Sequence, residues 1–121
     1  VGSMAACFLA RKGYQVDIYE MREDPRTLEH VPGKSINLSI SERGISALRS
    51  LGLEESFIQN YSIKMKARLI HNLNGTKKEI PYGRKDQFIL SVSRRFLNEL
   101  LLTEAEKYKN ININFSHKLI D

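Results

Sequence analysis

Cysteine, histidine and long apolar runs are scarce in this sequence. Its one cysteine, Cys7, cannot form a disulfide within the chain, and with only three scattered histidines the sequence defines no zinc site. No segment approaches the roughly 18 consecutive apolar residues that a membrane-spanning helix needs. Lys and Arg number 19 against 14 Asp and Glu, but the basic residues are spread along the chain. We therefore expect no nucleic-acid binding, and a basic cleft that attracts an anionic cofactor is the better interpretation.

The start of the chain carries the second half of a nucleotide-binding pattern. Gly2 stands where the last glycine of Gly-x-Gly-x-x-Gly would be, an amphipathic helix follows, and a strand at 15–19 ends in Glu20. In that pattern the helix start faces a pyrophosphate, and the acid about 20 residues further on accepts hydrogen bonds from a ribose. A carboxylate there repels a 2′-phosphate, so the site favours FAD or NAD over NADP. The same residues also suit a plain parallel-sheet unit with a surface glutamate.

The first strand and the first two glycines of the pattern are absent, so we expect the chain to be part of a longer enzyme. Hydrophobic periodicity predicts an α/β fold. It also predicts that residues 64–71, 77–82 and 87–92 form an antiparallel meander inserted into a parallel frame. Cys7 falls on the apolar face of the first helix and is expected to be a buried hydrophobe. Four helices are predicted: 3–12, one that Ser41 caps and Gly52 ends, 54–60 and 94–107. The other predicted strands are 15–19, 35–40 and 111–115. A polar loop is predicted at 22–34.

The middle of the chain offers a candidate site for a carboxylate. Arg68 and Tyr82 lie on neighbouring predicted strands, where a guanidinium fork and a phenol could hold one carboxylate together. Arg94, at the start of the last helix, could reach a cofactor phosphate. Each arginine could instead be a solvated surface residue. His30, His71 and His117 show no partner spacing, and we assign them no acid–base role.

Several motifs resemble one enzyme family over essentially the whole chain. They include Gly33-Lys34-Ser35-Ile36-Asn37-Leu38, Ile80-Pro81-Tyr82-Gly83 and Ile89-Leu90-Ser91-Val92-Ser93-Arg94. The sequence is similar to that of the FAD-dependent aromatic hydroxylases. The resemblance implies a Rossmann-type FAD-binding domain of the glutathione-reductase kind, beside a β-sheet substrate domain. Residues 1–121 would form an incomplete FAD-binding domain, and 63–92 would contribute strands toward the substrate domain.

The resemblance also implies what the individual residues bind. NADPH and O₂ would be co-substrates, and Arg68 and Tyr82 would hold the carboxylate of a small aromatic substrate. The chain carries no residue that we assign to catalysis, and by itself it is expected to be inactive. Positions matching FAD contacts are Val1, Gly2, Tyr19, Glu20, Met21, Arg22, Ser39, Arg94 and Leu119, of which Met21 and Ser39 differ from the residues usual in the family.

Two further expectations concern location and alternatives. In the family a C-terminal segment, outside this sequence, anchors the enzyme on the cytosolic face of the outer mitochondrial membrane. From the residues alone, a non-catalytic nucleotide-binding domain with a regulatory role remains the alternative, and a structural or interaction module is a weaker one.

Overall fold

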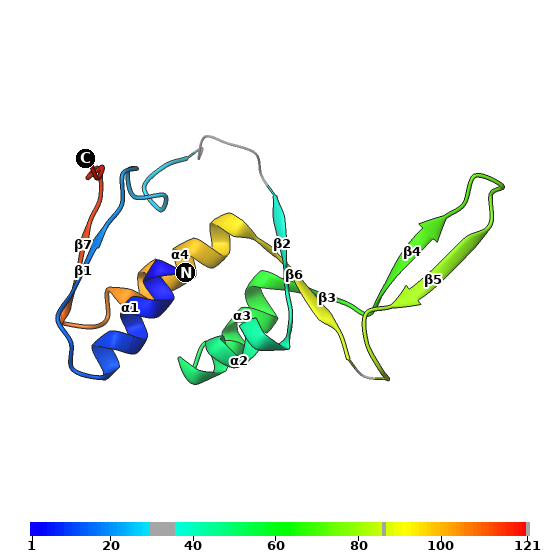
Figure 1. Ribbon diagram of the computed structural model, residues 1–121, viewed down its shortest axis with the longest axis horizontal. Coiled ribbons are helices and arrows are strands. Elements are labelled where there is room, and N and C mark those ends of the chain that lie inside the picture. Colours follow the sequence, from blue (N-terminus) through cyan, green and yellow to red (C-terminus); the bar gives the residue numbers. More distant parts are fainter. Residues whose placement is uncertain (30–35, 86, 121) are drawn as a thin grey trace. The chain divides into compact units, whose positions relative to one another are not determined.

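The chain divides into two structural units. A computed structural model describes residues 1–29, 36–85 and 87–120 (Figure 1). The first unit is built from Val1–Ser35 and Arg94–Asp121, and the second from Ile36–Ser93. His30 and parts of the predicted loop at 22–34 and strand at 35–40 lie outside the described residues.

The first unit is a small parallel α/β layer. Helices α1 (Gly2–Arg11) and α4 (Arg94–Ala105) pack on each other, and α1 also packs on strand β1 (Val16–Tyr19). Strand β1 pairs in parallel with β7 (Ile111–Asn114). The interface is made of small and aliphatic side chains that leave little room between the helices. Its buried members are Ala6, Cys7 and Ala10 of α1 and Leu101, Leu102 and Ala105 of α4, which confirms the expected burial of Cys7.

Asn110 joins the end of α1 to the start of this parallel sheet. Its side-chain amide donates hydrogen bonds to the backbone carbonyls of Ala10 (3.0 Å) and Tyr14 (2.6 Å). Its own carbonyl accepts the N–H of Val16 at 2.9 Å, just before the β1–β7 ladder begins. Gly13 makes the intervening turn with a φ of +87°, a conformation that glycine adopts without steric cost. One side chain therefore ties the last turn of α1 and the segment before β1 to the start of β7.

The second unit contains a three-stranded antiparallel sheet in the order β2-β6-β3 (Asn37–Ile40, Ile89–Ser93 and Ser62–Met65). Helices α2 (Glu42–Ser50) and α3 (Glu54–Tyr61) follow β2 in the chain and pack on each other. The central strand β6 alternates as a half-buried strand should, with Leu90 and Val92 both buried. Phe57 and Leu48 complete the core and are almost fully enclosed.

A separate hairpin extends this second unit. Strands β4 (Ala67–His71) and β5 (Lys77–Pro81) pair only with each other among the described residues. The turn between them closes through a hydrogen bond from the N–H of Gly75 to the carbonyl of Asn72 at 3.0 Å, and Gly75 has a φ of +81°. This is the turn that the Asn-Gly chemistry of the sequence predicts.

The observed elements confirm the mixed α/β class and correct the middle of the chain. The single strand predicted at 64–71 is two strands, β3 and β4, which separate at Lys66 and belong to different sheets. The predicted three-strand meander is also wrong, because β6 pairs with β2 and β3 and not with β5. The difference follows burial: β6 has two buried side chains, lies at the centre of its sheet and contacts α3, whereas β4 and β5 are mostly exposed.

The last helix is shorter than predicted, since it ends at Ala105 and not at Lys107. Within the described part of the chain, no helix has both the length and the apolar character needed to cross a membrane. The same residues contain no cluster of His, Cys, Asp or Glu that could hold a metal ion.

Candidate functional site

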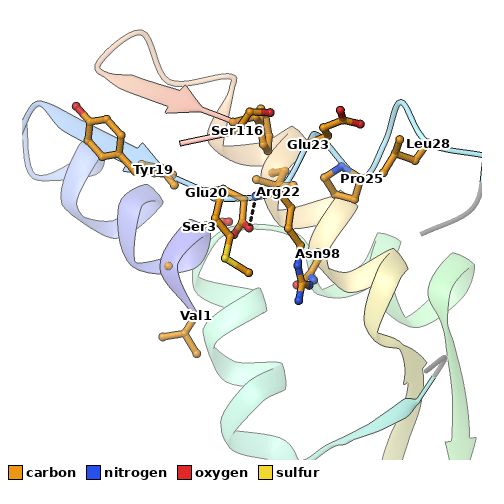
Figure 2. A pocket seen from close by; sticks show the side chains of 15 residues that line it. Val1, Ser3, Tyr19, Glu20, Arg22, Glu23, Pro25, Leu28, Asn98 and Ser116 are labelled. Carbon is orange, nitrogen blue, oxygen red and sulfur yellow. Dashed lines mark hydrogen bonds between the residues drawn. The ribbon is translucent and has the colours of Figure 1, made fainter. Parts of the chain in front are cut away.

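A pocket lies at the carboxyl end of β1, wholly within the first unit (Figure 2). Its volume is about 810 Å³. The start of α1, the end of β1, the loop after β1, one face of α4 and the segment after β7 all contribute to its wall. The lining residues are Val1, Gly2, Ser3, Ile18, Tyr19, Glu20, Met21, Arg22, Glu23, Pro25, Leu28, Asn98, Leu102, Phe115 and Ser116.

Glu20 lines this pocket and is held by hydrogen bonds to residues at the end of β7, beyond it and in the following loop. Its backbone N–H donates to the carbonyl of Asn114, and its carbonyl accepts the N–H of His117, both at 2.9 Å. Its Oε1 accepts the backbone N–H of Arg22 at 3.0 Å, the contact drawn as a dashed line in Figure 2. The carboxylate is therefore fixed at the end of a parallel strand, where the sequence pattern predicts a ribose-binding acid.

The start of α1 contributes partial positive charge to the same pocket. The first backbone hydrogen bond of the helix runs from the N–H of Ala5 to the carbonyl of Val1 at 3.0 Å. The N–H groups of Gly2, Ser3 and Met4 precede it and have no partner within the helix. Aligned peptide dipoles place partial positive charge here, so an anionic group is favoured beside it. An added Cβ at Gly2 would meet nothing within 4 Å in the described residues, so close packing on a preceding strand stays a prediction.

The structure gathers most of the predicted cofactor residues but not all of them. Six of them, Val1, Gly2, Tyr19, Glu20, Met21 and Arg22, line this pocket. Arg94 and Leu119 belong to the same unit and are exposed, but neither is among the described lining residues. Ser39 lies in β2 of the second unit.

Arg68 and Tyr82 lie on one face of the β4–β5 hairpin. Arg68 is directly opposite Ile80 in the antiparallel register, and Tyr82 lies two residues beyond Ile80. Side chains two residues apart on a strand share a face, so Arg68 and Tyr82 are diagonal neighbours across the pair. The backbone N–H of Tyr82 donates to the carbonyl of Lys66 at 2.9 Å, which extends the pairing to Tyr82. Both side chains are exposed, and a carboxylate could bridge them.

Sequence reasoning missed the contacts that hold the loop wall of the pocket. Arg26, in the loop after β1, forms ion pairs with both Asp24 and Glu106. Hydrogen bonds from its guanidinium lower the pKa of each of these carboxyl groups below its ordinary value. The Asp-x-Arg spacing at 24–26 is a local signal for part of this network. The contact with Glu106 spans 80 positions, and no pattern in the sequence marks it.

Several curated proteins that are similar to this chain share one name. The chain is 52% identical over 120 residues to kynurenine 3-monooxygenase of Sus scrofa, with 99% of this chain and 25% of that protein covered. It is 49% identical over 120 residues to that of Caenorhabditis elegans, covering 98% and 26%, and 42% identical over 119 residues to that of Legionella pneumophila (strain Corby), covering 98% and 26%. The chain thus spans about a quarter of the length of these relatives. No protein-family model matches it.

Solved structures agree on the fold. The crystal structure of pqsL, a probable FAD-dependent monooxygenase from Pseudomonas aeruginosa, matches with a TM-score of 0.76 at 15% identity, covering 94% of this chain and 29% of that chain. The p-nitrophenol 4-monooxygenase PnpA from Pseudomonas putida DLL-E4 matches with a TM-score of 0.74 at 16% identity, covering 96% and 29%. The resemblance predicted from the sequence motifs is therefore confirmed. The chain has the mixed α/β fold seen in FAD-dependent monooxygenases, and its sequence matches kynurenine 3-monooxygenases over nearly its whole length.

Proposed function

We propose that this chain is part of an FAD-dependent monooxygenase of tryptophan degradation, which converts L-kynurenine to 3-hydroxykynurenine with NADPH and O₂. The observation that carries the proposal is the 42–52% identity, over nearly the whole chain, to proteins named for that reaction. The chemistry of Arg68 in β4 and of Tyr82 just after β5 is consistent with the proposal, since kynurenine is an amino acid with a free carboxylate.

In this proposal the first-unit pocket takes the adenosine half of FAD. Glu20 accepts hydrogen bonds from the ribose hydroxyls, and the start of α1 faces the pyrophosphate. The residues fit such a group because the same cavity is lined by a fixed carboxylate and by a helix start whose first N–H groups have no partner within the helix. Bound FAD, once reduced by NADPH, supplies the oxygen-activating chemistry. Val1, Gly2, Tyr19, Met21 and Arg22 surround the ligand, and Ser39, Arg94 and Leu119 are proposed as further contacts.

The hairpin face holds the amino-acid end of kynurenine. Arg68 supplies a bidentate guanidinium fork and Tyr82 one hydrogen bond, which together orient the aromatic ring. A charged pair of this kind contributes about 1.5–3 kcal/mol when it is shielded from water. The amine on the ring already activates the neighbouring carbon, so the reaction does not require a strong base from this chain.

The proposal also covers the domain organisation and the location of the protein. Residues 1–121 form an incomplete FAD-binding domain, and 63–92 contribute strands toward the substrate domain. Location on the cytosolic face of the outer mitochondrial membrane, through a segment outside this chain, is supported only by the family resemblance.

The test uses the full-length protein that contains this sequence. Purified protein should show flavin absorbance and form 3-hydroxykynurenine from kynurenine, NADPH and O₂, and a colourless protein without this product would contradict the proposal. Arg68→Ala should raise the KM for kynurenine by about tenfold or more, since 1.4 kcal/mol is a factor of ten. Arg68→Lys should restore binding only in part, because an ammonium group cannot reproduce the fork.

The matched control for Arg68→Ala is Lys77→Ala. Lys77 pairs with His71 and so lies on the opposite face of the same hairpin. This control removes the same charge from the same element and should leave the KM for kynurenine unchanged. An unchanged KM in Arg68→Ala, or an equal rise in the control, would show that the hairpin face does not bind the carboxylate.

A further inference from the structure

One wall of the first-unit pocket is a loop without regular secondary structure. Arg22, Glu23, Pro25 and Leu28 line the pocket, and all four lie between the end of β1 and residue 29. No helix or strand ladder fixes the described part of this segment. Its conformation therefore depends on the side-chain contacts that tie it to the rest of the unit, because a free loop loses conformational entropy when a ligand orders it.

Arg26 supplies most of those contacts. Its Nε donates to Asp24 Oδ1 at 2.9 Å, so the loop is closed on itself by a local ion pair. Its Nη1 and Nη2 donate to the two carboxylate oxygens of Glu106, just past the end of α4, at 2.7 and 2.6 Å. The guanidinium also lies 6.0 Å from the ring centre of Phe115, which lines the pocket. Arg26 thus joins the loop to two other walls of the site.

These contacts use the guanidinium on both of its hydrogen-bonding edges. Asp24 takes the edge formed by Nε and Nη2, and Glu106 takes the edge formed by Nη1 and Nη2. A guanidinium that already donates to two carboxylates has few N–H groups left for a phosphate or a ribose. Arg26 itself is also not among the residues that line the pocket. Its effect on a ligand must therefore be indirect.

A second arginine holds the far end of the same loop. Arg95 of α4 donates through Nη2 to the carbonyl of Leu28 at 2.8 Å, and its Nε pairs with Glu99 at 2.6 Å. The loop is thus attached to α4 near Leu28, while Arg26 attaches its middle. At the near end of the loop, the N–H of Ser116 donates to the carbonyl of Arg22 at 2.9 Å. Between these two attachments, Arg26 makes the long-range side-chain hydrogen bonds of the stretch from Glu23 to Thr27.

We propose that Arg26 is a positioning residue for the adenosine half of FAD: by joining Asp24 to Glu106 it fixes the loop wall before the ligand binds. The inference rests on the proposed function, because it assumes that the pocket takes the adenosine half of FAD. Pre-organisation increases affinity by removing the entropy cost of ordering the loop in the complex. The ligand class is an adenosine diphosphate group, whether as ADP alone or as part of FAD.

The test measures binding by apoprotein prepared from the full-length protein. Arg26→Gln should raise the Kd for FAD by about tenfold, because binding must then also order the side chains of the loop. The Kd for ADP should rise in parallel, because the loop wall contacts only the adenosine half. Arg26→Lys should not restore affinity, since a lysine ammonium cannot fork two carboxylates.

Arg49→Gln is the matched control. Arg49 also binds two carboxylates, Glu42 at 3.1 Å and Glu54 at 2.6 Å, but it belongs to the second unit and does not line the pocket. This variant should keep the Kd for FAD within about twofold of wild type. A merely structural role of Arg26 would lower the melting temperature of the apoprotein without changing the Kd of the folded fraction.

Different failures lead to different conclusions. If wild-type apoprotein binds neither FAD nor ADP, the proposed function is wrong. If wild type binds both and Arg26→Gln keeps both Kd values within about twofold, the positioning role is overturned while the proposed function stands. If Arg26→Gln does not fold, Glu106→Gln replaces it, since this change leaves the Asp24 pair intact. A raised Kd in Glu106→Gln then supports the inference, and an unchanged Kd overturns it.

Discussion

Removing the carboxylate of Glu20 tests the proposed nucleotide site directly. Glu20→Ala should weaken FAD binding by the full-length apoprotein without disturbing the strand that carries it. The backbone of Glu20 is held on both sides by hydrogen bonds to Asn114 and His117, which do not involve the side chain. Among the hydrogen bonds of the described residues, the substitution removes the one from the N–H of Arg22 to Oε1. The structure therefore predicts a binding defect with little loss of stability.

The size of that defect follows from the chemistry of the acceptor. Hydrogen bonds to a charged group contribute about 1.5–3 kcal/mol, which corresponds to roughly 10- to 150-fold in Kd. Glu20 is only half-buried, so water competes for its oxygens and the lower end of this range applies. We expect Glu20→Ala to raise the Kd for FAD by about tenfold. Glu20→Gln, which keeps the shape and one acceptor oxygen but loses the charge, should give a smaller rise.

Quenching of flavin fluorescence during titration of the apoprotein measures both values. Glu23→Ala is the control, because Glu23 lines the same pocket and carries the same charge on the exposed loop after β1 (Figure 2). Removing that charge should change the Kd by no more than about threefold. Unchanged affinity in Glu20→Ala would refute the ribose assignment. An equal rise in Glu23→Ala would attribute the effect to the overall charge of the pocket.

Two predictions concern stability. Asn110→Ala should lower the free energy of unfolding by about 1–3 kcal/mol, since two hydrogen bonds to backbone carbonyls are lost. Asn110→Asp should lower it further at pH 7, because an ionised carboxylate cannot donate a hydrogen bond to those carbonyls. Urea unfolding of the full-length protein measures both, and equal stability of the two variants would contradict the assignment. The hydrogen bond from Arg26 lowers the pKa of Asp24 from its ordinary value of 3.8. The contribution of ionised Asp24 to the free energy of unfolding is therefore complete above pH 3.8, and it is lost as the pH falls through the lowered pKa. In thermal unfolding at a series of pH values, the advantage of wild type over Asp24→Asn should shrink below about pH 4, and an advantage that stayed constant down to pH 2 would exclude this linkage.

Local patterns predicted the parts of the site that depend on neighbours in the sequence. Glu20 could be found because a helix, a glycine turn and a strand follow one another at the spacing of a nucleotide-binding unit. The common face of Arg68 and Tyr82 also has a local origin. The Asn-Gly turn fixes the hairpin register, and the register decides which positions share a face.

The strand pairing in the middle of the chain was predicted wrongly. Residues 87–92 read as the third strand of a meander, because the nearest strand in sequence is the usual neighbour. Alternation alone does not say which sheet a strand joins. β6, which carries the buried Leu90 and Val92, lies between β2 and β3 in the sheet that α3 contacts, whereas the β4–β5 hairpin is mostly exposed.

The network around Arg26 shows why the wall of a binding site is harder to predict than its ligand contacts. Residues that touch a nucleotide lie at the ends of strands and helices, and their spacing along the chain repeats wherever that unit is built. Arg26 instead depends on Glu106, which is 80 positions away and follows α4, a helix that packs on α1. No spacing rule encodes such a contact, because any acid at the end of that helix could supply it. Substitutions at Arg26 and Glu106 should therefore alter cofactor affinity although neither position belongs to the nucleotide-binding pattern.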